Sequence, residues 1–364
     1  MKKINEKKWA AFTVENLFDE IKATKGKTTG QLMKGDDVPY IAAAKTNNGF
    51  ATMCSSSECP QWVSEGNTIV FVQLGDGAAG LAYYVPMDFI GMNGKTSSGY
   101  NSELSEDNGI FIARCLSSNK AIFSHGHSWT GRRLLSTKTM LPKNAVGKPD
   151  YDYMTEYTRH KRKVLLKKYE IYANKRIVEL GKYNKIISTS QKNWKSFLIS
   201  DIFNILPGKR LVAANSTPGD RPFIGALDNS NGVAHFVSDA NASLDKNVLG
   251  VNYNGNGMVV GFYHPYECIF SDDVKRFHLK HHKDNAFVLL FMKVAILQQK
   301  RKFGYLYKFN ADRMANTRIM LPIAVDGTPD YEYMEQYVKN VMLSKYKQYI
   351  AFLESKERTG KSTE

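Results

Sequence analysis

The chain has 364 residues, and at roughly 150 residues per domain this length predicts two domains and excludes a single small one. Hydrophobic residues make up 43% and charged residues 23%, which argues against a disordered, collagen-like or fibrous chain. Lys and Arg outnumber Asp and Glu by 50 to 35, a balance of +15 that favours a polyanionic partner, nucleic acid above all. Four cysteines and the absence of any apolar run near the roughly 20 residues of a membrane span predict a cytoplasmic protein that does not enter a membrane.

The strongest pattern in the sequence is an internal repeat. Residues 140–157 read MLPKNAVGKPDYDYMTEY and residues 320–337 read MLPIAVDGTPDYEYMEQY, with identical residues at more than half of the positions. Further matches follow in the same order at Trp9 and Trp194, Phe12 and Phe197, Phe18 and Phe203, and Gly26-Lys27 and Gly208-Lys209. A repeat of this length predicts two copies of one fold, each of about 180 residues.

The repeat divides the chain into segments that we expect in a fixed order. They are a globular domain at 1–150, a long helix and linker at 151–190, a second globular domain at 191–330, a second long helix at 331–358 and a tail at 359–364.

Each globular domain is predicted to mix strands and helices. Short apolar or alternating runs, such as 68–72 and 248–253, are separated by Gly, Asn and Asp turn residues, which is typical of strands. Residues 285–300 instead carry a long apolar pattern opened by a capping Asp284 or Asn285, which indicates a helix. The predicted fold class is therefore α+β, with two similar mixed domains.

A long helix follows each domain. Asp150 and Asp330 are candidate N-caps, and no Pro interrupts the helical composition that runs to about Leu180 and Arg358. Apolar positions recur by threes and fours, the spacing of a helix that packs along another helix. We expect two long antiparallel helices that separate the two domains, related by a pseudo-twofold axis.

Catalytic signatures are few. No phosphate-binding loop motif occurs. Asp150 and Asp152, with Asp330 and Glu332 in the repeat, could be paired carboxylates of a metal-dependent nuclease, but helix capping is the favoured interpretation because residues two apart do not share a helix face. The histidines at 278, 281 and 282 could bind a metal, yet the lysines and arginine around them favour a solvated basic turn.

Several loops combine basic residues, amides, tyrosines and glycines. Lys neutralises phosphate, Asn, Gln and Arg can pair with base edges, and Gly allows close backbone approach. The same Asn-Gly and Asp-Gly steps are also ordinary hairpin turns, so that alternative stays open for each loop. The predicted DNA-binding residues are Lys25, Lys27, Lys45, Asn47, Gln73, Arg132, Lys209, Arg210, Asn229, Asn254, Asn256, Lys300, Arg301, Lys302, Tyr305, Tyr307 and Lys308. Arg133 and Arg313 align in the repeat and could be structural instead.

The order of these elements resembles a known family. Two domains that each open with Trp-x-x-Phe, continue through a Gly-Lys turn and close with a Leu-Pro strand before a long helix are similar to the DNA-specificity subunits of restriction-modification systems. The resemblance covers essentially the whole chain. It implies two target recognition domains that each read one half of a bipartite site, and helices that set the spacing and dock methyltransferase or fused nuclease-methyltransferase subunits. The PDYDYM and PDYEYM helix starts look more like type IIB than type I subunits, so the partner set stays open.

The leading hypothesis is a non-catalytic DNA-recognition subunit without a cofactor of its own. S-adenosylmethionine and Mg²⁺ are expected on the partner subunits, as the resemblance implies, and double-stranded DNA is the expected ligand. Two alternatives remain: a catalytic DNA enzyme such as a metal-dependent nuclease, and a DNA-binding regulator that acts without an enzyme partner.

Overall fold

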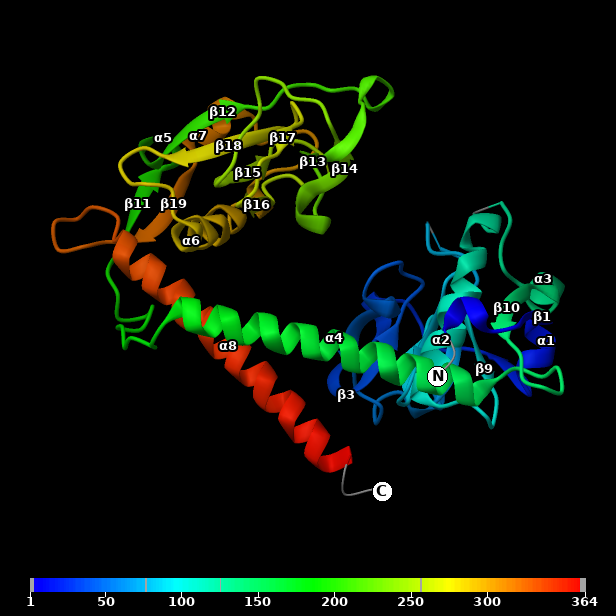
Figure 1. The fold of residues 1–364 in the computed structure, drawn as a ribbon. Helices are drawn as coiled ribbons and strands as arrows, with labels where there is room; N and C mark the ends of the chain where they lie inside the picture. The colour runs from blue at the N-terminus through cyan, green and yellow to red at the C-terminus, as the bar shows by residue number, and fades with distance from the viewer. Residues whose placement is uncertain (1–2, 76, 125, 256, 361–364) are drawn as a thin grey trace. The chain divides into compact units, whose positions relative to one another are not determined.

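The computed structural model describes residues 3–75, 77–124, 126–255 and 257–360. The chain divides into two compact units, residues 1–169 and 170–364, and the boundary falls inside a long helix (Figure 1).

The described residues of unit 1 form three small sheets. An antiparallel pair joins β1 to β10, a four-stranded sheet has the order β2-β9-β6-β7, and a second has the order β4-β3-β8-β5. The strands are β1 (Trp9–Thr13), β2 (Glu20–Ala23), β3 (Lys34–Ile41), β4 (Phe50–Cys54), β5 (Val63–Ser64), β6 (Thr68–Val72), β7 (Ala82–Val85), β8 (Phe89–Gly91), β9 (Thr96–Tyr100) and β10 (Lys138–Pro142). The helices are α1 (Val14–Leu17), α2 (Glu106–Leu116), α3 (Gly131–Ser136) and α4 (Tyr151–Leu180), of which α4 continues into unit 2.

Unit 2 repeats this arrangement. Its sheets have the orders β11-β19, β12-β18-β15-β16 and β14-β13-β17, and an isolated bridge between Asp245 and Cys268 stands where unit 1 has β5. The strands are β11 (Trp194–Leu198), β12 (Phe203–Pro207), β13 (Pro218–Ile224), β14 (Val233–Val237), β15 (Val248–Asn252), β16 (Gly261–His264), β17 (Ile269–Phe270), β18 (Val274–Leu279) and β19 (Arg318–Pro322). The helices are α5 (Ile199–Ile202), α6 (Ala286–Leu297), α7 (Ala311–Asn316) and α8 (Tyr331–Gly360). The two units therefore share one topology, as the repeat predicts.

The smallest sheet explains why two distant motifs repeat together. In unit 1 the Trp-x-x-Phe strand β1 pairs with the Leu-Pro strand β10, so that Trp9 lies opposite Pro142. Unit 2 places Trp194 opposite Pro322 in the same register. Each Trp ring stacks on a Phe of the neighbouring helix, at a centroid distance of 6.1 Å in unit 1 and 6.2 Å in unit 2. In each unit the two motifs are therefore the two paired strands of one small sheet.

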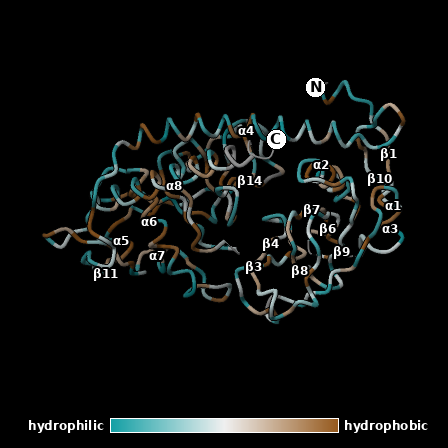
Figure 2. Tube along the Cα trace, turned by 90° about the horizontal axis from the view of Figure 1, so that it is seen from below, coloured by the Kyte–Doolittle hydropathy of each residue, from teal (hydrophilic) through white to brown (hydrophobic). Residues whose placement is uncertain are grey.

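The helix predicted from residue 285 is α6. The Asn285 side chain accepts hydrogen bonds from the amides of Phe287 and Val288, which caps the helix. The hydrophobic sequence of α6, visible as a brown stretch in Figure 2, packs against β16, β19 and α8. A helix that is apolar on most faces has to be covered on most faces, and the sheet and α8 together provide that cover.

Both long helices begin at their predicted caps. The Asp150 Oδ1 atom accepts from the Tyr153 amide at 3.0 Å, and Asp330 Oδ1 accepts from the Tyr333 amide at 2.9 Å. Within unit 2 the last turns of α4 and the linker run antiparallel to α8, because Tyr172 meets Tyr346 while Asn184, later in the chain, meets Asn340. Across the described residues, neither of these helices nor any other is long and apolar enough to cross a membrane.

Candidate nucleic-acid interface

Three predicted loops of unit 1 lie side by side. The amide of Gly26 donates to the Gly91 carbonyl at 2.9 Å, and a Cβ on Gly26 would stand 2.3 Å from Ile90, so only glycine allows this approach. The amide of Gln73 donates to the Lys95 carbonyl at 2.8 Å. A Cβ on Gly75 would stand 2.9 Å from the Ala43 carbonyl oxygen, which shows that the third loop is in contact as well. We call residues 24–28, 42–49, 73–75, 77–80 and 92–95 the interface loops of unit 1.

Basic side chains gather on the interface loops of unit 1. Lys25, Lys27 and Lys45 are exposed, and so is Asn47. Lys95, on the turn before β9, is exposed beside them. Sequence reasoning missed Lys95, although its Gly94-Lys95 turn repeats the pattern of Gly26-Lys27.

Unit 2 assembles its loops in the same way. The Lys209 amide donates to the Phe270 carbonyl at 2.8 Å, and the Ser271 amide donates to the Ile224 carbonyl at 2.8 Å. The Asn252 side chain donates to the carbonyls of Leu227 at 2.6 Å and Gly257 at 3.1 Å. We call residues 208–210, 225–232, 252–255, 257–258 and 271–273 the interface loops of unit 2; Lys209, Arg210 and Asn229 are exposed on them.

Some predicted contacts are already engaged inside the protein. The Asn254 amide donates to Asp273 Oδ1 at 3.1 Å, and Gln73 is half-buried. Arg210 stands 3.9 Å from Asp272, an exposed pair that leaves its guanidinium largely free to solvent. The predicted residue Asn256 lies outside the described residues.

The hairpin-turn alternative also holds for part of the loops. Asn47, Asn48 and Asn231 have φ near +50°, and Gly49 and Gly232 follow with positive φ as well. Asn tolerates this left-handed conformation better than most residues, so the Asn-Gly steps serve the turn. A turn role does not occupy the exposed side chain of Asn47.

The basic and tyrosine-rich segment at 300–308 follows α6. Lys300–Lys302 form a short 3₁₀ helix with all three side chains exposed, and Tyr305 and Tyr307 lie on the turn that follows. Lys308 is half-buried, with Nζ 5.7 Å from the centre of the Tyr305 ring.

The aligned arginines are structural. Arg313 Nη1 donates to the Lys308 carbonyl at 2.8 Å, and Arg133 Nη1 donates to the Ser128 carbonyl at 2.8 Å. Each arginine therefore braces the turn before a short helix, α7 or α3. Arg132, beside Arg133, is exposed on α3.

The basic stretch at the start of α4 is partly used within unit 1. Arg159 Nε lies 2.8 Å from Asp107 on α2, and Arg162 pairs with both Asp107 and Glu106 at 2.9 Å. These pairs attach α4 to the N-terminal turn of α2, so this part of the positive charge serves the fold.

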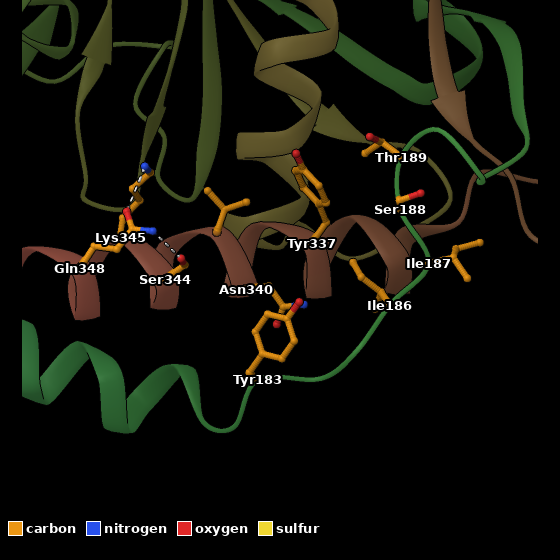
Figure 3. Close-up of a pocket in the computed structure, with 11 residues that line it drawn as sticks. Tyr183, Ile186, Ile187, Ser188, Thr189, Tyr337, Asn340, Ser344, Lys345 and Gln348 are labelled. Atoms are coloured by element: carbon orange, nitrogen blue, oxygen red, sulfur yellow. Dashed lines mark hydrogen bonds between the residues drawn. The ribbon is translucent and has the colours of Figure 1, made fainter.

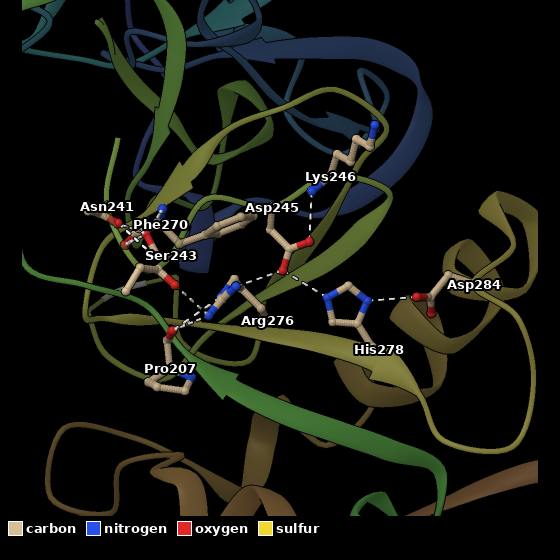
Figure 4. A network of polar contacts seen from close by, with 10 residues as sticks. Pro207, Asn241, Ser243, Asp245, Lys246, Phe270, Arg276, His278 and Asp284 are labelled. Atoms are coloured by element: carbon tan, nitrogen blue, oxygen red, sulfur yellow. Dashed lines mark hydrogen bonds and ion pairs between the residues drawn. The ribbon is translucent and has the colours of Figure 1, made fainter. Parts of the chain in front are cut away.

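The prediction of a solvated basic turn is wrong for His278. Its ring lies on β18, with Nε2 2.9 Å from Asp245 and Nδ1 2.7 Å from Asp284 (Figure 4). The bond to Asp284, followed by the bond to Asp245, raises the pKa of His278 to about 9 against the opposing effect of burial. Arg276 also pairs with Asp245 at 2.8 Å. Spacing along the sequence could not show this because Asp245 is 33 residues away.

The two other histidines and the carboxylates form no metal centre. His282 stacks on Tyr331 at 4.4 Å between ring centres, and His281 is exposed. Asp330 is engaged as a cap and pairs with Lys192 at 2.6 Å. In the part of the chain that the structure describes, no group of three or more His, Cys, Asp or Glu side chains is arranged to hold a metal ion.

A second surface of unit 2 is a groove of about 430 Å³ beside α8 (Figure 3). The linker after α4 forms one wall with Tyr183 and Ile187, which are 60% and 52% exposed. Val341 and Lys345 of α8 form the other wall. The groove thus combines apolar and basic side chains on the helical part of unit 2.

Comparison with known proteins decides the family. Residues 191–351 match the family model described as type I restriction modification DNA specificity domain. Over 350 residues the chain is 37% identical to the specificity subunit S.BcgI of a type II restriction enzyme from Heyndrickxia coagulans, a match that covers 91% of this chain and 94% of the relative. The chain belongs to the DNA-specificity subunits of restriction-modification systems. As such it recognises DNA sequence, and the resemblance inferred from the repeated motifs is confirmed.

Solved structures were matched as well. The type I S subunit from M. genitalium is 13% identical with a TM-score of 0.48, covering 99% of this chain and 96% of the other. The HsdS subunit from Thermoanaerobacter tengcongensis is 11% identical with a TM-score of 0.32, covering 95% and 91%. The assignment of this specificity subunit to its family rests on the sequence relative and the family model.

Proposed function

We propose that residues 1–150 and 191–330 of this specificity subunit are two target recognition domains, each reading one half of a bipartite DNA site. The observation that carries the proposal is the repeated placement of exposed basic loops at equivalent points of one topology. Two similar recognition domains on one chain suit a site in two parts, since each domain can contact its own set of base edges.

The interface loops supply the contacts that such reading needs. Lys25, Lys27, Lys209 and Arg210 are exposed cations suited to phosphates, and Asn47 offers an amide suited to a base edge. The glycines at 26 and 208 let these turns approach neighbouring backbone closely, because a Cβ would stand 2.7 Å from the Gly91 carbonyl oxygen at position 26 and 1.9 Å from the Ser271 carbonyl oxygen at position 208. The backbone that carries these cations is thereby held against the sheets.

The chain carries no catalytic step in this proposal. Asp150 and Asp330 are committed to capping and to ion pairs with Lys7 and Lys192. A partner subunit that binds S-adenosylmethionine would methylate the DNA, and Mg²⁺ would serve a nuclease partner. The complex would work in the cytoplasm, where the four free cysteines stay reduced.

The helices α4 and α8 dock those methyltransferase or nuclease-methyltransferase subunits. The groove between the linker and α8 supports this, because exposed Tyr183 and Ile187 of the linker and Val341 of α8 offer apolar contact area beside the helix. Lys345 at its edge would favour an acidic rim on the partner.

The methylation pattern of a host genome tests the proposal. Cells that carry the partner subunits are sequenced with and without this gene. The expected result is a methylated motif in two parts, separated by a fixed spacer, that disappears when the gene is removed. Methylation that persists without the gene, or a continuous motif without a spacer, contradicts the proposal.

A further inference from the structure

An exposed apolar tip stands out on unit 2. The turn at 304–307 is closed by two backbone hydrogen bonds, from the Gly304 amide to the Tyr307 carbonyl at 3.2 Å and from the Tyr307 amide to the Gly304 carbonyl at 3.0 Å. Tyr305 and Leu306 at its tip are 85% and 95% exposed. Single exposed apolar side chains are common on protein surfaces, and this pair differs in the fixed turn beneath it and the cations beside it.

The base of this turn is fixed. The ring of Phe303 stacks on Tyr307 with an angle of 8° between the planes, and it also contacts the fully buried Phe309 at 4.5 Å. Arg313 lies on the Tyr307 ring, with Cζ 3.9 Å from the ring centre. Leu306 is therefore held outward by a rigid frame, which lowers the entropy cost of inserting it into a ligand.

Unit 1 has the same frame without the apolar tip. Ser124 and His127 form the equivalent pair of backbone bonds, both at 3.1 Å, and Phe123 stacks on His127 and Trp129. Gly126 takes the position of Leu306, and His125 lies outside the described residues. At the described tip position, unit 1 has a glycine where unit 2 has Leu306.

The surroundings of the tip indicate its ligand. Exposed Lys300, Arg301 and Lys302 precede the turn, so cations stand at its base. The amide of Phe309, which follows the turn, donates to Met258 Sδ at 3.3 Å, and this contact joins the turn to the interface loops of unit 2. An apolar side chain flanked by cations is complementary to a polyanion with an apolar interior. DNA is such a polyanion, because its stacked bases lie between two rows of phosphates.

We propose that Leu306 inserts between two stacked bases of the half-site that unit 2 reads, with Tyr305 against the neighbouring base. Inserted apolar side chains unstack one base step and bend the duplex, and sequences with easily unstacked steps then bind best. Unit 2 would therefore read part of its half-site through the ease of deforming it, whereas unit 1 would not. This inference rests on the proposed function.

The test uses the assembled complex on DNA that carries the methylated motif. The fluorescent base 2-aminopurine is placed in turn at each adenine of both half-sites except the methylated ones, because its emission rises when it is unstacked and a methyltransferase itself unstacks the base that it methylates. The expected result is a rise at one step of the half-site of unit 2 and no rise in the other. Leu306→Ser should remove the rise and weaken DNA binding about tenfold, the typical scale of one lost base-specific contact. Leu306→Met should keep both.

The matched control is Val325→Ser. Val325 is another fully exposed aliphatic residue on a turn of unit 2, between β19 and α8. It should change neither emission nor binding, and both serine variants should unfold at the wild-type urea concentration.

Four results overturn the insertion, the last of them together with the proposed function. The first is a wild-type complex that binds the motif without a rise in 2-aminopurine emission in the half-site of unit 2. The second is a Leu306→Ser complex that keeps this rise. A Leu306→Ser chain that binds DNA normally but no longer retains its partner subunits would assign the tip to a protein contact. A wild-type complex that fails to bind any motif in two parts overturns the proposed function together with the insertion.

Discussion

Asp330 holds two partners at once, and separating them tests whether this carboxylate serves the fold or chemistry. Its Oδ1 atom caps α8 by accepting from the Tyr333 amide at 2.9 Å, and its Oδ2 atom pairs with Lys192 at 2.6 Å. The Lys192 side chain is only 12% exposed, and its Nζ lies 5.0 Å from the centre of the Tyr333 ring. Asp330→Asn removes the charge but keeps an oxygen that can cap the helix.

The expected loss follows from the burial of this pair. Exposed ion pairs contribute up to about 1 kcal/mol, and breaking a fully buried pair costs about 3–5 kcal/mol. The Asp330 side chain is 21% exposed, so we expect Asp330→Asn to cost about 1–2 kcal/mol of unfolding free energy. Asp330→Ala also loses the cap, which adds about 1 kcal/mol. In a Lys192→Met background, Asp330→Asn should cost under about 0.5 kcal/mol, because no charge is then left unpaired.

Urea unfolding of each variant measures the cost, and methylation by the assembled complex measures function. A structural Asp330 predicts a shifted unfolding transition and methylation that persists wherever the chain is folded. An Asp330→Asn chain that unfolds like the wild type yet supports no methylation would refute the structural account and favour a catalytic carboxylate.

Three further predictions address charge and docking. Because the pKa of His278 is raised to about 9 in the folded chain, its bonds stabilise the fold fully below about pH 6.5, and this stabilisation, up to about 3 kcal/mol, is lost as the pH rises through 9. The unfolding free energy of His278→Gln, measured in urea, should therefore depend less on pH between 6.5 and 9 than that of the wild type. An unchanged pH dependence would contradict this. Lys209→Ala should reduce the slope of log affinity against log salt by about 1, whereas Lys195→Ala on β11, outside the interface loops, should not; equal slopes for both would exclude a phosphate contact by Lys209. Val341→Glu in the groove should weaken retention of a methyltransferase subunit by at least about tenfold while unfolding stays unchanged, and full retention would remove the groove from the docking surface.

Much of the fold could be predicted because the chain contains its architecture twice. Matching residues at a nearly constant offset fixed the repeat, and Asp150 and Asp330 marked the starts of α4 and α8 as the structure has them. Helices are local, so composition and caps are enough to place them. The order β2-β9-β6-β7 could not be predicted, because β2 and β9 pair across more than seventy residues and no local pattern encodes such a pairing.

The interface shows the same division between local and distant causes. The turns at Gly26 and Gly208 carried a local signal, and their lysines are exposed where the pattern indicated. His278 was misjudged because its acidic partner Asp245 lies on a distant loop. Leu306 was overlooked among the basic residues of its segment, since only the structure shows that its side chain is 95% exposed.

The central claim is that each globular domain reads one half of the site. Its most direct test replaces residues 3–150 with the matching segment of the Heyndrickxia coagulans relative and determines the methylated motif of cells that carry the hybrid complex. The account predicts that one half of the motif changes, while the other half and the spacer stay as they were. A motif in which both halves change, or in which neither does, would contradict it.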